Sequence, residues 1–158
     1  MSTQTRGRHR DDRGAAAVEF ALVAPILVAL LLGMVDYGLF FADAIGMRQG
    51  IRENARKAVV SDFVVSPACN SGGDLDKIRC QTKADIIAFS GTAQVKITAP
   101  SGWVKGEPLT VCAVIANPGV TKFVPMPSEI TSKVEMAIET QSLPPSGTMT
   151  STDAGVTC

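Results

Sequence analysis

The feature that most limits this fold is an apolar run of 21 residues, from Ala15 to Val35. As a helix it would measure about 31 Å, which matches the hydrocarbon thickness of a bilayer. An ordinary secretory signal peptide has a shorter apolar core and a small-x-small cleavage site, which this run lacks. The sequence therefore predicts a transmembrane helix over 15–35. Pro25 is expected to bend or loosen that helix.

One carboxylate interrupts the apolar run, at Glu19. A charge at mid-bilayer costs about 2.5–3.5 kcal/mol, so an ionisable residue in a span indicates a function and a partner. A cut between Gly14 and Ala15 would create an amine four residues before Glu19, on the same helix face and about 6 Å along the axis. We expect Glu19 to pair with such an amine, most usefully on a second subunit. A plain signal anchor, the alternative, has no use for the carboxylate.

Charge is unevenly distributed although the net charge is zero. Residues 1–14 hold four of the 15 basic and two of the 15 acidic residues, which leaves 11 basic and 13 acidic residues in the other 144. A basic flank before an apolar run predicts a single-pass protein of the cytoplasmic membrane, with its N-terminus inside and its C-terminus outside. We expect a cytoplasmic leader over 1–14, an exported domain over 36–140 and a tail over 141–158. The sequence has no excess of basic residues that would indicate nucleic acid binding.

Helical periodicity continues beyond the apolar run. Apolar or small residues recur there at spacings of three and four, which places them on one stripe. The members of this stripe are Phe40, Ala44, Met47, Ile51, Ala55 and Ala58. Charged residues such as Asp43 fall largely elsewhere. We expect one helix of about 45 residues, half in lipid and half a spine for the exported domain. A row of small residues, Ala42, Gly46 and Gly50, would admit a second helix or pack against the protein's own sheet.

The exported part is expected to have an α+β, pilin-like fold, with the long helix packed on an antiparallel sheet of about three strands. Alternation or continuous apolarity predicts strands over 94–98, 109–116 and 133–139, the second of them central. A short helix is expected over 76–89, with Asp74 or Asp76 as its cap.

The connections are predicted from turn-forming residues. Glycine and proline predict a hairpin loop over 100–106 and a longer link over 117–129. Serine, threonine, glycine and proline dominate 141–158, which is expected to be extended or mobile except where Cys158 holds it.

All four cysteines follow the apolar run, on the expected exported side, where disulfides persist. An even count fits two bridges, although sequence alone does not decide their connectivity. We predict Cys69 with Cys80, closing a short loop, and Cys112 with Cys158, pinning the tail to a strand. Free buried thiols are the alternative. Zinc is disfavoured because the only histidine, His9, lies in the leader.

Residues for enzyme chemistry are missing from the exported part. It has no histidine to serve as a base beside a nucleophile, and no glycine loop precedes a helix to hold phosphate. Asp74 and Asp76 could bind calcium or cap a helix, but further acidic positions of a calcium loop are absent. We expect that the protein is not an enzyme and that it binds no cofactor and no metal. Trp103, the only tryptophan, is expected either to contact a partner or to cover the edge of its own core.

The N-terminal residues as a set resemble those of type IV pilins and pseudopilins. The set comprises a basic leader, Gly14, Ala15, Glu19, Phe20 and the apolar run. More narrowly, RGAAAVEFALVAPILVALLLGMVDYG, over 13–38, looks like the TadE-like proteins, which are pseudopilins of the Tad (Flp) pilus assembly system. The exported part agrees with that family only loosely, in its late apolar strand, its proline-containing link and its final strand.

The resemblance implies a site and partners. A prepilin peptidase would cut after Gly14, and Ala15 would become the mature N-terminus. Glu19 would register the subunit against other pilin-like subunits through the N-terminal helix, first in the lipid bilayer and, after assembly, in a surface pilus.

Three functions follow from the sequence. Because the exported domain is larger than the short major pilins, the resemblance favours a minor pilin or pseudopilin that is structural and non-enzymatic. A membrane-anchored adhesin or binding module outside a pilus, with Trp103 and the 117–129 link as its contact surface, is the alternative. A membrane-anchored sensor unrelated to pili is the third.

Overall fold

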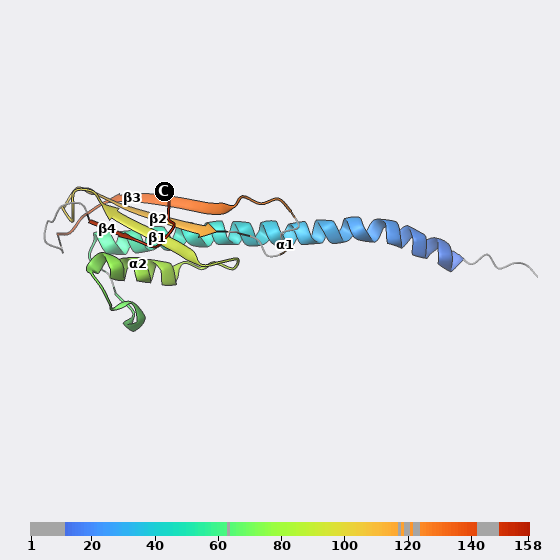
Figure 1. The fold of residues 1–158 in the computed structure, drawn as a ribbon, viewed down its shortest axis with the longest axis horizontal. Helices are drawn as coiled ribbons and strands as arrows, with labels where there is room; N and C mark the ends of the chain where they lie inside the picture. Colours follow the sequence, from blue (N-terminus) through green and yellow to red (C-terminus); the bar gives the residue numbers. More distant parts are fainter. Residues whose placement is uncertain (1–11, 63, 117, 119–120, 122–123, 142–148) are drawn as a thin grey trace, which may run out of the picture.

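A single helix organises the molecule. The computed structural model describes residues 12–62, 64–116, 118, 121, 124–141 and 149–158. Helix α1 (Asp12–Val59) runs for 48 residues without interruption, and Pro25 lies inside it. Figure 1 shows that its C-terminal half lies against the sheet, whereas its N-terminal half projects away from the domain. The predicted long helix shared between a projecting part and a soluble spine is therefore confirmed.

A four-stranded antiparallel sheet covers one side of the spine, with strand order β3-β2-β1-β4. Its strands are β1 (Ala93–Ala99), β2 (Pro108–Ala116), β3 (Glu129–Ala137) and β4 (Met149–Thr152). Strand β2 is interior, as its continuous apolarity predicts. Strand β3 begins at Glu129, four residues before the predicted strand. The fourth strand was not predicted, because 141–158 was expected to be extended or mobile apart from Cys158.

Two helices share one face of this sheet, α1 over β2 and β3 and α2 (Asp74–Asp85) over β1 and β4. A short 3-10 turn, η1 (Pro67–Cys69), precedes α2. Alternate strand residues and the predicted stripe of α1 meet in one core. Its fully buried members include Met47, Ile51, Val95, Ile97, Leu109, Val111 and Ile115. The stripe predicted from Met47 to Ala58 is buried as expected, and this burial joins α1 to the sheet.

The small residues of α1 pack against the protein itself. A Cβ added at Gly46 would lie 2.4 Å from the carbonyl oxygen of Ile87, and one at Gly50 would lie 2.8 Å from Cγ1 of Ile86. Both glycines thus admit the chain that leaves α2. Of the two alternatives for this row, packing within the chain is the one observed, although its partner is the segment after α2 and not the sheet.

Trp103 and two disulfides hold separate parts of the domain together. Trp103 is only 1% exposed, and its Nε1 donates a hydrogen bond to the carbonyl oxygen of Thr140 at 3.0 Å. The structure pairs Cys69 with Cys80 and Cys112 with Cys158, at Cα–Cα distances of 5.5 and 6.5 Å. These are the pairs expected from the sequence. Trp103 is a core residue, because its ring is enclosed and its polar atom is satisfied internally.

The close approach at Gly46 generates a stability prediction. Gly46→Ala should lower the free energy of unfolding by about 1–3 kcal/mol, because the new methyl group overlaps the backbone at Ile87. Gly38→Ala is the matched control on the same helix, since a Cβ there meets nothing within 4 Å. That control should gain about 1 kcal/mol from helix propensity. Urea unfolding of the full chain in detergent micelles, followed by circular dichroism, measures both. Equal gains at the two positions would contradict the packing.

Candidate functional site

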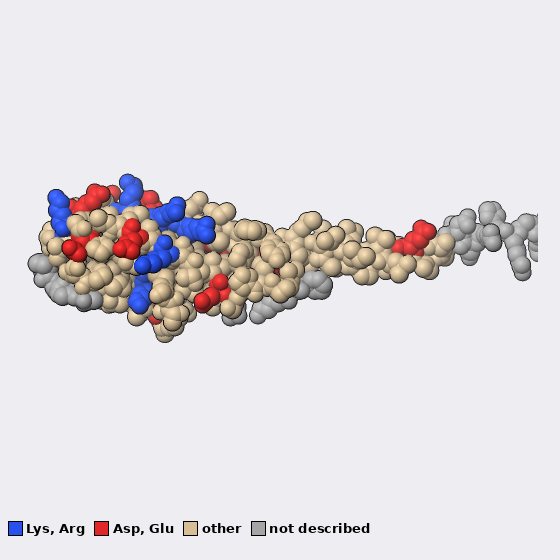
Figure 2. Space-filling view, turned by 90° about the horizontal axis from the view of Figure 1, so that it is seen from above, with Lys and Arg blue, Asp and Glu red and all other residues tan. Residues whose placement is uncertain are grey.

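The projecting part of α1 exposes apolar side chains that no other element covers. Its large hydrophobic residues are exposed, for example Phe20 at 71%, Leu22 at 70% and Ile26 at 64%. By length and composition the helix can cross a membrane, and none of its most apolar 18-residue window is buried. In Figure 2 charged side chains gather on the domain, and the projecting helix is almost free of them. Exposed apolar surface on this scale marks a lipid or protein interaction site.

The predicted processing and pairing residues lie at the far end of this helix. Gly14, Ala15 and Glu19 are all exposed, and a Cβ at Gly14 would meet nothing within 4 Å. The bond between Gly14 and Ala15 falls in the first turn of α1, where intrahelical hydrogen bonds are incomplete. Among the residues that the structure describes, none forms a hydrogen bond or ion pair with the Glu19 side chain. The described part of the chain thus supplies no partner for this carboxylate.

Two buried aspartates on α1 were missed by the sequence reasoning. Asp36 and Asp43 are both 0% exposed. Asp43 accepts hydrogen bonds from the backbone N–H groups of Phe89, at 2.5 Å, and Ser90, at 3.1 Å, and from the Ser90 hydroxyl. Asp36 accepts the backbone N–H of Thr121 at 2.9 Å and its hydroxyl. Each carboxylate thereby fixes a loop of the domain to α1, since several donors offset its loss of hydration.

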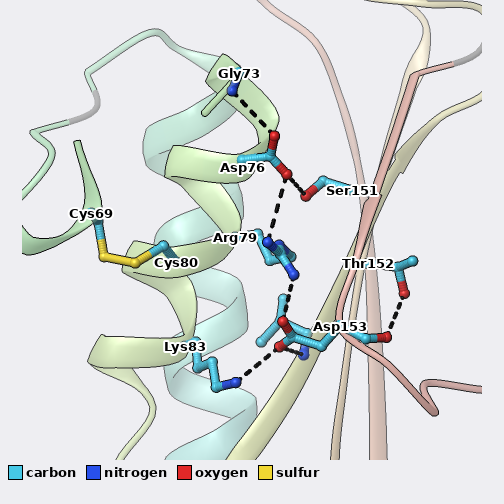
Figure 3. Close-up of polar contacts among 10 residues, drawn as sticks. Cys69, Gly73, Asp76, Arg79, Cys80, Lys83, Ser151, Thr152 and Asp153 are labelled. Atoms are coloured by element: carbon cyan, nitrogen blue, oxygen red, sulfur yellow. Dashed lines mark hydrogen bonds and ion pairs between the residues drawn. A yellow bond between two sulfur atoms is a disulfide. The ribbon is translucent and has the colours of Figure 1, made fainter. Parts of the chain in front are cut away.

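A polar network joins α2 to the end of the chain (Figure 3). Asp153 accepts hydrogen bonds from Arg79 at 2.5 Å, from Lys83 at 3.2 Å and from the backbone N–H of Val95 at 3.0 Å. Beside it, Asp76 accepts the Ser151 hydroxyl at 2.6 Å. The network explains why residues after Met149 form a strand, because polar contacts replace the apolar alternation that they lack.

The acidic loop predicted as a calcium-binding alternative has a structural role. Asp74 and Asp76 lie in the first turn of α2, and the Asp76 carboxylate accepts the backbone N–H of Gly73 at 3.1 Å. Gly73, and not either aspartate, occupies the N-cap position. Within the described part of the chain, no group of three or more histidine, cysteine, aspartate or glutamate residues is placed to bind a metal ion. The arrangement fits helix capping and electrostatic stabilisation of α2.

The network predicts acid sensitivity at β4. The Ser151 hydroxyl, the Gly73 N–H and the Arg79 charge lower the pKa of Asp76 below 3.8, against an opposing effect of burial. The carboxylate therefore stabilises the fold fully above pH 3.8, and this contribution is lost as the pH falls through the lower folded pKa.

Asp76→Asn should accordingly reduce the loss of stability between neutral pH and about pH 3, relative to the unaltered protein. The measurement is the urea midpoint of the full chain in detergent at several pH values. Asp74→Asn is the control, because Asp74 is exposed and lies 3.6 Å from Lys77 without joining the network. If both variants change the pH profile equally, Asp76 has no special part in holding β4.

Comparison with known proteins bears on helix α1 alone. No curated protein and no solved structure matches the chain. The model of the family described as TadE-like protein matches residues 14–56, which covers the projecting helix and most of the spine and includes Gly14, Ala15 and Glu19. The predicted resemblance to the TadE-like family, which is associated with the Tad pilus system, is thereby confirmed over residues 14–56.

Proposed function

We propose that this protein is a minor pilin or pseudopilin that acts in the assembly of a Tad-type (Flp) surface pilus, with a structural and non-enzymatic role. The observation that supports this most is the projecting half of α1, which exposes an apolar surface and a Glu19 carboxylate without a partner in the described structure. In this proposal the helix first resides in the cytoplasmic membrane and later packs against other pilin-like subunits. The family match over residues 14–56 supports the same system.

Glu19 supplies register in this proposal. A carboxylate in a low-dielectric region is costly alone, and an opposite charge offsets most of that cost. After a prepilin peptidase cuts behind Gly14, the amine of Ala15 on a neighbouring subunit is a suitable partner. The pair adds little net stability, but a shifted helix would leave two orphan charges, each costing several kcal/mol. Glu19 therefore selects one axial position among the many that apolar side chains alone would permit.

The binding-module alternative loses its main contact residue. It relied on Trp103 in an exposed loop, and Trp103 is 1% exposed with its Nε1 bonded to Thr140. The 117–129 link, its other proposed surface, lies partly outside the described residues. No observation in the described structure favours adhesion over assembly.

Processing is the first test. In cells that contain the prepilin peptidase, mass spectrometry of the membrane-extracted protein should find Ala15 as the mature N-terminus. Gly14→Val should retain the leader, because valine places a β-branched side chain next to the cleaved bond, where glycine has none. Gly38→Ala, in the same helix and remote from that bond, should be processed normally. An intact leader on the unaltered protein would contradict the proposal.

Register is the second test. Glu19→Gln should leave membrane insertion and leader removal unchanged, but reduce incorporation into sheared pilus fractions and crosslinking to neighbouring pilin-like subunits. The physical reason is that the neutral amide cannot compensate the amine charge. Val23→Ala, four residues along the helix and 61% exposed, is the control and should assemble normally. Normal assembly of Glu19→Gln would exclude Glu19 as the register residue.

A further inference from the structure

On its two sides, the exposed apolar surface of α1 ends at different positions along the helix axis. On the domain side, Asp36, Asp43 and Met47 are all 0% exposed. On the opposite side, Met34, Phe41 and Ile45 repeat the same spacings two residues earlier and are 68%, 59% and 55% exposed. Two residues correspond to about 200° around a helix, so the two sets lie on opposite faces.

The domain already covers its own side of the helix near Gly33. A Cβ added there would lie 3.4 Å from Cγ2 of Val124, and the next turn holds Asp36 with its bonds to Thr121. On the opposite face the exposed apolar side chains continue to Ile45. The difference of 12 residues amounts to about 18 Å along the helix axis. A boundary between lipid and water that follows both faces must therefore cross the axis obliquely.

The opposite face then becomes basic. Arg48 and Arg52 follow Phe41 and Ile45 at intervals of seven residues, and both are exposed. In the described part of the chain neither arginine has an ion pair or a side-chain hydrogen bond, whereas nearby Arg56 lies 3.7 Å from Glu53. Arginines directly beyond an apolar stripe suit lipid phosphates, which accept their hydrogen bonds while the aliphatic stems remain near the acyl chains.

We propose that α1 crosses the bilayer strongly tilted, so that the face formed by Met34, Phe41, Ile45, Arg48 and Arg52 rests on the outer leaflet and the sheet points away from it. The inference depends on the membrane residence in the proposed function. The exposed apolar stretch from Val18 to Ile45 is about 40 Å long against a hydrocarbon thickness of about 30 Å, which corresponds to a tilt of about 40°. The bound ligand is the anionic headgroup of a phospholipid.

A flanking loop supports the same orientation. Ile87 and Phe89 lie in the loop between α2 and β1, and they are 65% and 64% exposed. They are held beside the same stretch of α1, because Ile87 packs on Gly46 and the Phe89 N–H is bonded to Asp43. Figure 1 shows this loop running alongside α1 towards its projecting half. The exposed apolar surface at this level thus extends beyond a single helical stripe.

Charge distinguishes lipid from a second copy of the chain as the occupant of this face. A parallel copy in register would bring Arg48 and Arg52 close to the same arginines, and like charges repel. Phosphates of an anionic leaflet offer the opposite charge along the whole stripe. Lipid is therefore the better complement to the observed pattern.

Quenching by brominated lipids tests the proposal on the full chain in nanodiscs of phosphatidylcholine with phosphatidylglycerol. Tryptophan is introduced by Phe41→Trp, or by Val28→Trp within the span, or by Lys133→Trp on the open face of the sheet. The native Trp103 is buried near the end of α1 and gives a constant background. Lipids brominated close to the headgroup should quench most of the added emission of Phe41→Trp and little of that of Lys133→Trp. Adding Arg48→Gln and Arg52→Gln should remove the dependence on phosphatidylglycerol.

The outcomes separate this inference from the proposed function. Quenching of Val28→Trp without quenching of Phe41→Trp would overturn the tilted arrangement while leaving membrane residence intact. Absence of quenching at both positions would overturn both. Emission from Phe41→Trp that responds to protein density, and not to brominated lipid, would assign the face to a second copy of the chain and so overturn the lipid proposal.

Discussion

The continuity of α1 determines the rest of the structure. A helix satisfies its own backbone hydrogen bonds in water and in lipid alike, so one element can serve two solvents. Between Met47 and Val59 its buried stripe packs into the domain core together with residues of α2 and the sheet. Before Gly33 the same helix has exposed apolar side chains on all sides. The domain therefore packs on the C-terminal part of the helix, and no other described element covers the N-terminal part.

Apolar periodicity predicted the elements whose positions are set by burial. The stripe from Met47 to Ala58 and the continuous apolarity of β2 both record contact with a core, and both were read correctly from the sequence. Strand β4 could not be found in this way, because Met149–Thr152 is held by its ladder to β1 and by the contacts of Asp153 with α2. Those contacts join residues more than 55 positions apart, and a local pattern contains no trace of them.

The site residues proposed from the sequence rest on a local signal. Gly14, Ala15 and Glu19 stand out against a uniform apolar run, and their exposure in the structure does not test the roles proposed for them. Asp36 and Asp43 were overlooked. Asp36 lies seven residues before Asp43, and Asp43 lies four residues before Met47, so both fall on the helix face of the buried stripe. A charged residue on the face of an apolar stripe was the available signal. For Trp103 the sequence left two alternatives open, a partner contact or a place at the edge of its own core, and the buried ring with its bond to Thr140 is consistent with the second.

The two buried aspartates have a geometrical consequence for the whole molecule. Asp36 and Asp43 bind loops from two different parts of the domain, so the domain cannot rotate about the axis of α1 without breaking both sets of hydrogen bonds. The helix has no described break between Asp12 and Val59. The direction in which Glu19 points is thus tied to the direction in which the open face of the sheet points. Any molecule that binds Glu19 therefore also sets the direction in which the open face of the sheet points, about 60 Å away along about 40 residues of helix.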